Sequence, residues 1–283
     1  SGCYKDDITG QILVDSLIEQ ARKVEMDYFE QKQVWELRDK VECFQRTGRP
    51  PVTVRWVDAN KGDDIHTNYR SRLVARQMKR KGTESIFAGT PPLEAVRTVI
   101  SMAATSCGKW TPNWDPKSKK RTQILLIDIS RAYFNAKTDP NQPTYVELPK
   151  EHPEHGKKVG LLKRHMYGTL GAADGWQEEY SCSLIEFGFR QGLSSACVFT
   201  NEEREVICAV HGDDFTFTGP ADQLYEIEKM MRNKYELKVG GRLGPGLNDD
   251  KEATILNRVI RWQEKSLEYE ADPRQAETLV YEL

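Results

Sequence analysis

The sequence predicts an α+β fold built on antiparallel strands. Two short runs of mainly branched aliphatic residues, 124–127 and 206–210, have the composition and length of buried strands. Residues 52–57 and 69–76 alternate apolar and polar side chains on either side of a turn, which predicts a β-hairpin. Helical spacing of apolar residues predicts helices within 9–40, 93–105 and 167–187.

Length and composition are those of a folded protein. The chain has 283 residues, which allows one large domain or two lobes at roughly 100–200 residues per domain. Hydrophobic residues make up 38% of the chain, so wholesale disorder is excluded. No apolar run approaches the roughly 20 residues of a membrane span, and no secretory signal is evident, so we expect no membrane partner. The six cysteines lack the spacing of a disulfide framework or a zinc site.

Positive charge is concentrated in one short segment. The whole chain has 41 Lys+Arg against 43 Asp+Glu, a net charge of −2, so no overall basic field indicates a nucleic-acid partner. Residues 70–81 contain no carboxylate but carry six cations: Arg70, Arg72, Arg76, Lys79, Arg80 and Lys81. This density favours phosphate binding, and the alternative is an ordinary solvated face.

Carboxylates follow both of the predicted buried strands. Asp128 ends the run 124–127, and Asp213 and Asp214 follow the run 206–210, before residues that alternate like a return strand. Pairing of these strands would gather three acids into one patch, and their repulsion would demand cations. Mg²⁺ prefers such oxygen ligands together with water and substrate phosphates. The pattern predicts metal-assisted phosphoryl transfer, although adjacent Asp residues are also common in tight turns.

The residues around these acids resemble the palm motifs of reverse transcriptases. Asp128 is followed five residues on by Tyr133, as in the first palm motif, and the tetrapeptide 211–214 is similar to the third. The segment 167–176 lies between them with the order and spacing of copia-type retrotransposon polymerases. Further matches in order extend the resemblance over roughly residues 30–262.

The resemblance implies a right-hand polymerase fold with palm and fingers and at most a partial thumb. The palm would be an antiparallel sheet with helices behind it. The expected subdomains are an N-terminal helical extension at 1–50, fingers at 51–122 and 137–166, palm at 123–245, and the palm end or thumb start at 246–283.

A two-metal catalytic site is the main functional implication of the resemblance. Asp128 and Asp213 would hold Mg²⁺ or Mn²⁺. Asp214 lies beside them, and the backbone carbonyl of Ile129 would add a further ligand. Two such ions can activate a primer 3′-hydroxyl and neutralise charge on the phosphates. Tyr133 falls where the family has a steric gate against a 2′-hydroxyl, and its alternative is a core aromatic.

The resemblance also implies which side chains contact nucleotide and template. Residues two apart on a strand share a face, so the arginines of 70–76 can line one side of the hairpin. The expected nucleotide-binding set is Lys61, Arg70, Arg72, Arg76, Tyr133 and Gly168. The expected nucleic-acid-binding set is Lys79, Arg80, Lys81 and His211.

Two motifs depart from the family pattern. The usual Gln-Ser-Pro of the middle motif is Gly-Ala-Ala at 171–173, which removes side-chain donors near the template. The usual Tyr-Val at the catalytic turn is His211-Gly212, and this glycine is expected to loosen the turn. All three acids are present. We therefore expect effects on efficiency and fidelity rather than on the metal site.

The function that follows is reverse transcription as part of a retrotransposon polyprotein. Its partners would be an RNA or DNA template with a primer, deoxynucleoside triphosphates, and other Pol and Gag segments, in cytoplasmic virus-like particles or the nucleus. One alternative is a catalytically weak or inactive relic that binds nucleic acid or builds the particle. A second is another two-metal enzyme, such as a nucleotidyl cyclase, which leaves the basic hairpin unexplained.

Overall fold

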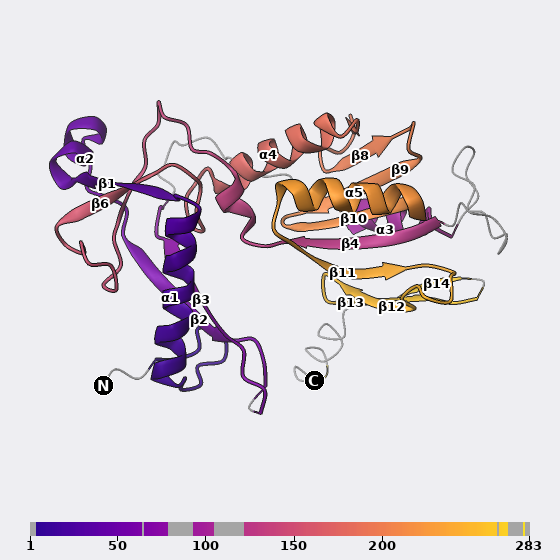
Figure 1. The fold of residues 1–283 in the computed structure, drawn as a ribbon, viewed down its shortest axis with the longest axis horizontal. Helices are drawn as coiled ribbons and strands as arrows, with labels where there is room; N and C mark the ends of the chain where they lie inside the picture. Colours follow the sequence, from indigo (N-terminus) through magenta and orange to yellow (C-terminus); the bar gives the residue numbers. More distant parts are fainter. Residues whose placement is uncertain are drawn as a thin grey trace. The chain divides into compact units, whose positions relative to one another are not determined.

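A computed structural model of the chain describes residues 4–63, 65–78, 93–104, 122–264, 266–270 and 280 (Figure 1). The chain divides into two compact units. The first comprises Ser1–Phe87 and Tyr133–Glu179, and the second comprises Ala88–Ala132 and Tyr180–Leu283. Each unit has its own cluster of buried apolar side chains.

The first unit combines helices with small antiparallel sheets. Its elements are α1 (Asp15–Gln31), β1 (Trp35–Asp39), α2 (Lys40–Thr47), β2 (Val54–Asn60), β3 (Tyr69–Ala75), the short 3-10 helix η1 (Ala132–Asn135), β5 (Tyr145–Glu147) and β6 (Lys158–Leu162). The described strands pair in the orders β1-β6-β5 and β2-β3. Helix α4 (Ala172–Glu186) begins in this unit and ends in the second.

Alternation along β3 gives the β2–β3 hairpin one buried face and one more exposed face. Ser71, Leu73 and Ala75 are buried, and α1 packs on this side of the hairpin. Arg70 and Arg72 alternate onto the opposite face, because successive side chains of a strand point to opposite sides. The apolar positions of β3 therefore orient its arginines.

The second unit is built on a six-stranded antiparallel sheet of order β11-β4-β10-β9-β8-β7. These strands are β4 (Thr122–Ile129), β7 (Arg190–Gln191), β8 (Val198–Asn201), β9 (Val206–His211), β10 (Asp214–Pro220) and β11 (Leu237–Leu243). The helices are α3 (Leu93–Ser101), α5 (Ala221–Lys234) and the end of α4. A second sheet consists of β12 (Glu252–Ile255), β13 (Arg258–Trp262) and β14 (Leu267–Tyr269).

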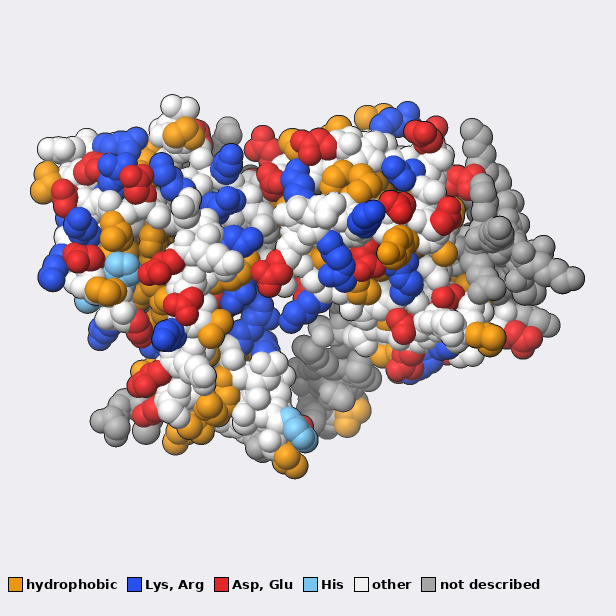
Figure 2. All heavy atoms as spheres, in the orientation of Figure 1, with side chains coloured by type: hydrophobic (Ala, Val, Ile, Leu, Met, Phe, Trp, Pro, Cys, Tyr) orange, Lys and Arg blue, Asp and Glu red, His pale blue; other side chains and the backbone are white. Residues whose placement is uncertain are grey.

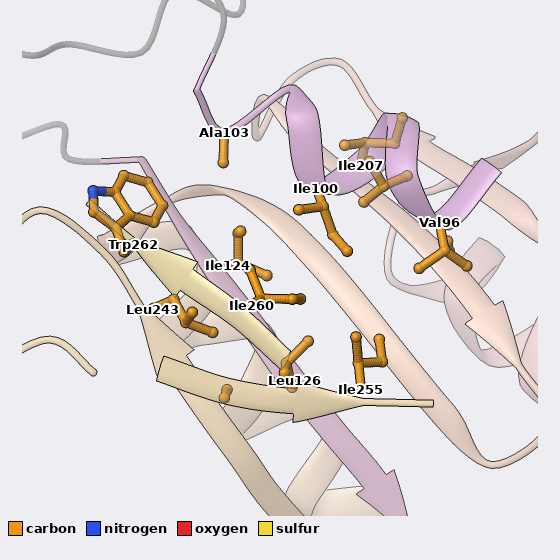
Figure 3. Packing of buried hydrophobic residues seen from close by; sticks show 13 residues of the cluster. Val96, Ile100, Ala103, Ile124, Leu126, Ile207, Leu243, Ile255, Ile260 and Trp262 are labelled. Atoms are coloured by element: carbon orange, nitrogen blue, oxygen red, sulfur yellow. The ribbon is translucent and has the colours of Figure 1, made fainter. Parts of the chain in front are cut away.

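Helices and the second sheet cover the two faces of the six-stranded sheet. On one face, Val96 and Ile100 of α3 pack with Ile124 and Leu126 of β4 and with Ile260 of β13 (Figure 3). On the other face, α5 packs against β10 and β4 (Figure 1). The end of α4 lies on this second face too, where the rings of Tyr180 and Phe215 meet edge to face, 5.6 Å apart. This burial holds the strand ends in fixed register.

The α+β prediction is confirmed, and so are its two buried strands. The runs 124–127 and 206–210 lie within β4 and β9. One helix, α1, lies within 9–40, where one or two helices were expected, but it ends at Gln31 and residues 35–39 form strand β1 instead. Pairing of β1 with β6 overrides the local helical spacing. The helix predicted over 167–187 begins only at Ala172.

The two compact units do not have the same boundaries as the subdomains expected from the sequence. Residues of the expected N-terminal extension, 1–50, share a unit with the hairpin, and α3 shares a unit with the six-stranded sheet. The assignment of fingers, palm and thumb stays a prediction. On the face shown in Figure 2, acidic and basic side chains are interspersed, in keeping with the net charge of −2. Among the described residues, no helix has the length and apolar character needed to cross a membrane.

Candidate active site

Polar side chains form a row across one end of the six-stranded sheet. Asp128 on β4 lies directly opposite Asp214 on β10 and directly opposite Lys238 on β11. Asp214 in turn lies opposite His211 on β9. Directly opposed residues of antiparallel strands project to the same face, so these four side chains lie on one side of the sheet.

A β-bulge in β11 lets both ends of that strand face the same way. Lys238 pairs with Asp128, and Leu243 pairs with Ile124, so five positions along β11 correspond to four positions along β4. The register shift between Val239 and Gly241 makes this possible. Leu243 can therefore pack in the core beneath α3 while Lys238 stays beside the acid.

The turn between β9 and β10 is a two-residue hairpin loop. His211 and Asp214 are its flanking pair, with Gly212 and Asp213 at the centre. Gly212 has φ +65°, and a glycine at the first central position is typical of a type II′ turn, which matches the twist of the strands. The carbonyl oxygen of Asp213 accepts a hydrogen bond from the Ile129 N–H at 3.0 Å. Gly212 thus supplies the positive φ that this turn requires, and its effect on the flexibility of the turn stays a prediction.

The carboxylates are close enough to affect one another. Burial, together with the charges of Asp213 and Asp128, raises the pKa of Asp214 from its ordinary value of 3.8 to about 6. Asp128 is itself exposed, and Asp213 is half-buried. The sequence-based prediction that the three acids form one patch is therefore supported by their electrostatic interaction.

Repulsion at this patch predicts that Asp214→Asn stabilises the metal-free protein. Folding raises the pKa of Asp214, so its ionised form is disfavoured in the folded state, and stability falls as pH rises from about 4 through about 6. The variant should gain about 1 kcal/mol above pH 7, after allowance for solvent screening, and much less near pH 4. Thermal unfolding at both pH values in the presence of a chelator measures this difference.

A neutralised acid elsewhere on the same sheet provides the control. Glu203 is exposed in the turn between β8 and β9, at the opposite end of β9 from the acids. Glu203→Gln should leave the unfolding temperature nearly unchanged at both pH values. An equal gain for Asp214→Asn at pH 4 and pH 7.5 would contradict the electrostatic explanation.

The donor chemistry of the patch fits a hard divalent cation. Mg²⁺ takes one or two protein carboxylates and completes its shell with water and phosphate oxygens, and the opposed Asp128 and Asp214 supply such a pair. Within the described ranges, no three His, Cys, Asp or Glu side chains already form a metal-ligand cluster. The assignment of Asp213 and the Ile129 carbonyl as further ligands stays a prediction.

The predicted nucleotide-binding cations are spread along the β2–β3 hairpin. Lys61 is exposed at the turn, where its N–H donates to the carbonyl oxygen of Asn68 at 2.8 Å. Arg70 is near this end, and Arg72 follows it on the same face of β3. Arg76 comes after the end of β3, roughly 20 Å from Arg70 at about 3.3 Å per residue. The hairpin therefore spreads these cations along its length, with Arg72 between Arg70 and Arg76 in the chain.

The loop before α4 docks on the end of β3. Ala75 donates its N–H to the carbonyl oxygen of Tyr167 at 2.8 Å, and Gln77 donates its N–H to that of Gly168 at 3.3 Å. Gly168 has φ +82°, and a Cβ atom there would lie 1.9 Å from the carbonyl oxygen of Ala75. Glycine is the residue that this approach of two backbones permits.

Docking of this loop gathers three of the predicted nucleotide-binding residues around Tyr167. The Arg72 guanidinium lies 4.5 Å from the centre of the Tyr167 ring, and the Tyr133 ring meets Tyr167 edge to face at 4.9 Å. The Nε atom of Arg72 is buried without a hydrogen-bond acceptor in the described part of the chain. Arg72, Tyr133 and Gly168 thus form one cluster, whereas Lys79, Arg80 and Lys81 lie outside the described residues.

The chain matches one known protein family over most of its length. The family described as reverse transcriptase (RNA-dependent DNA polymerase) matches residues 33–248, well over half of the chain. The chain belongs to this reverse transcriptase family. The expected copia-type reverse transcriptase domain is thereby confirmed. The matched region contains the three acids, the β2–β3 hairpin and the loop around Gly168.

Solved structures include a similar chain from a larger reverse transcriptase. It is a foamy viral protease-reverse transcriptase dRH in complex with double-stranded DNA, with a TM-score of 0.48 and 11% sequence identity. The similarity covers 98% of the present chain and 39% of the foamy viral chain, so the present reverse transcriptase chain spans well under half of that protein. No curated protein matches.

Two residues of this reverse transcriptase were absent from the sequence-based site. Tyr167 was noted only as the first residue of the middle motif, and its contacts with Arg72 and Tyr133 depend on docking of distant segments. Lys238 follows the catalytic hairpin in the sequence, and its place opposite Asp128 depends on the order of strands in the sheet. Spacing along the chain predicts neither the docking of these segments nor the order of the strands.

Proposed function

We propose that this chain adds deoxynucleotides to a primer 3′-hydroxyl, directed by an RNA or DNA template. The observation that carries the proposal is the opposed pair Asp128 and Asp214, with Asp213 in the adjoining turn, inside the region matched by the reverse transcriptase family. Such a pair at an exposed sheet end can hold divalent ions while leaving coordination positions for substrate phosphates.

The acids would act as a rigid holder for Mg²⁺ or Mn²⁺. Asp128 and Asp213 would bind the ions, with Asp214 and the carbonyl of Ile129 completing the protein's share of the ligands. Bound ions supply positive charge that lowers the pKa of the attacking hydroxyl and stabilises the leaving pyrophosphate. Because β4 and β10 are hydrogen-bonded neighbours, the separation of their carboxylates is fixed before substrate arrives.

The hairpin and the Tyr167 cluster would bind the incoming nucleotide. The planar guanidinium of Arg72 can bind phosphate oxygens bidentately, and its buried Nε–H lacks an acceptor among the described residues. Arg70, on the same face of β3, and Lys61 at the turn would add charge. Tyr133, which is partly exposed and held edge-on by Tyr167, would contact the sugar and exclude a 2′-hydroxyl.

The sugar contact predicts that Tyr133→Ala relaxes discrimination against ribonucleotides. Removing the ring opens space for a 2′-hydroxyl, and the ratio of ribonucleotide to deoxynucleotide kcat/KM should rise by about a hundredfold. Single-nucleotide incorporation with each substrate measures the ratio. Tyr133→Phe keeps the ring and should keep the ratio, so equal discrimination by the Ala and Phe variants would argue against a sugar contact.

Primer extension tests the proposed function directly. A labelled DNA primer on an RNA template, with deoxynucleotides and Mg²⁺ or Mn²⁺, should be extended, and chelation of the metal should stop extension. Template–primer binding without extension would favour the second candidate, a binding or particle-building protein. The observation favouring that candidate is the altered middle motif, in which Gly-Ala-Ala at 171–173 replaces the usual Gln-Ser-Pro.

The setting of this activity is also a proposal. We expect deoxynucleoside triphosphates and a primed template as substrates, and other Pol and Gag segments as polyprotein partners. The site of action would be cytoplasmic virus-like particles or the nucleus.

A further inference from the structure

Residues that precede the family match are built into the β2–β3 hairpin. The match begins at residue 33, whereas helix α1 ends at Gln31. Phe29 of α1 is fully buried in one cluster with Leu73 of β3. The face of the hairpin opposite Arg72 is therefore covered by a segment outside the matched family region.

The first residues of this segment bind the edge of β2 that β3 leaves free. Asp7 donates its N–H to the carbonyl oxygen of Asp58 at 2.9 Å, and one carboxylate oxygen of Asp7 accepts the Asp58 N–H at 2.8 Å. The buried Asp6 accepts the Asn60 N–H at 2.8 Å. Residues 6–7 thus complete the hydrogen bonding of β2 as a third strand would.

Arg22 of α1 is the central contact between the segment and the hairpin. It forms ion pairs with Asp58 at 2.5 Å and with Glu151 at 2.7 Å. Its guanidinium also lies over the rings of Tyr4 and Trp56, 4.5 Å and 5.1 Å from their centres. Only 12% of the Arg22 side chain is exposed, so these charge and ring contacts are largely screened from solvent.

Asp58 links Arg22 to strand β3, which carries Arg70 and Arg72. Its side chain is 6% exposed and accepts a hydrogen bond from Ser71 Oγ at 2.6 Å. Ser71 lies directly opposite Asp58 in the register and between Arg70 and Arg72 on β3. A shift of Ser71 would move both arginines, because all three share one short stretch of backbone.

We propose that Arg22 is a positioning residue for nucleotide binding, acting through Asp58 and Ser71 on Arg70 and Arg72. This inference rests on the proposed function. It makes residues 4–31 part of the nucleotide-binding hairpin rather than a separable extension. A buried carboxylate such as Asp58 needs a cationic partner, and the fork of Arg22 satisfies it while reaching Glu151 as well.

Arg22→Gln in the full chain tests the proposal by two readouts. Hydrogen exchange of the amides in β2 and β3 should become about tenfold faster, with no change in β4 and β9. In primer extension, the KM for deoxynucleotide should rise by about tenfold, while kcat stays within about twofold. The control, Arg190→Gln, removes an exposed ion pair with Glu202 and should change neither readout.

A double variant tests the proposal if Arg22→Gln alone does not fold. Arg22→Gln/Asp58→Asn removes both charges and keeps hydrogen-bonding groups, so no buried charge is left unpaired. It should fold and still show faster hairpin exchange and a raised KM, because the contacts to Glu151 and the rings are lost. Hairpin exchange and KM equal to wild type in this variant, or a lower kcat at unchanged KM, overturn the proposal.

Failure of the proposed function has a different signature. If the wild-type chain extends no primer, the polymerase assignment fails while the exchange experiment still applies. Calorimetric titration with a deoxynucleoside triphosphate then replaces KM. Weaker binding by Arg22→Gln together with faster hairpin exchange supports the positioning role, and wild-type values in either measurement overturn it.

Discussion

Asp128→Asn is expected to lower the rate of primer extension by about a thousandfold or more. Asp128 lies between Asp214 and Lys238 on the two neighbouring strands, so it is one of the two inner side chains of the row. An amide keeps the shape of the side chain but removes the negative charge that a divalent ion requires. Asp128 is exposed at the end of β4, so the fold should tolerate the change.

Single-turnover extension at saturating Mg²⁺ measures the loss of rate for Asp128→Asn. Fluorescence anisotropy of a labelled template–primer measures binding, which should stay within about threefold of wild type, since one charge is a small part of the phosphate contacts. Glu203→Gln, at the other end of β9, should extend primers at the wild-type rate. Extension by Asp128→Asn above about a tenth of the wild-type rate would exclude it as a metal ligand.

The sequence was sufficient to predict the acids of this site but not their full surroundings. Asp128, Asp213 and Asp214 stand out because each follows a strongly apolar run, where a carboxylate has no packing reason to be. Their convergence needs only that β4 and β10 pair, which short apolar strands favour. The place of Lys238 opposite Asp128 depends on β11 joining the far side of β4 and on the bulge after Val239.

For the nucleotide-binding hairpin too, the sequence predicts the local pattern but not the long-range contacts. Alternation along β3 was enough to predict that Arg70 and Arg72 share a face. It could not predict that strand β3 ends at Ala75, because where a strand ends depends on its partner. Nor could local spacing predict that Arg22, 36 residues before Asp58, pairs with it. Long-range contacts of this kind form from tertiary packing rather than from local pattern.

Gly168→Ala is expected to lower the free energy of unfolding by about 4 kcal/mol, from left-handed backbone strain and a backbone clash together. A Cβ atom would lie 1.9 Å from the carbonyl oxygen of Ala75 and 2.8 Å from Val74 Cγ1. The backbone oxygen cannot move aside without breaking the hydrogen bonds that dock the loop on β3. Tyr167 would then lose its place between Arg72 and Tyr133, so nucleotide KM should rise as well.

Gly156→Ala separates the two causes of this loss. Gly156 has φ +77°, close to the φ of +82° at Gly168, but a Cβ there would meet no atom within 4 Å. Its substitution should cost only the strain of a left-handed residue, about 1 kcal/mol, and leave nucleotide KM unchanged. Denaturant unfolding of both variants measures the difference. If Gly168→Ala lost no more stability than Gly156→Ala, the loop would not be held against β3 as described, and Tyr167 could not be what brings Arg72 and Tyr133 together.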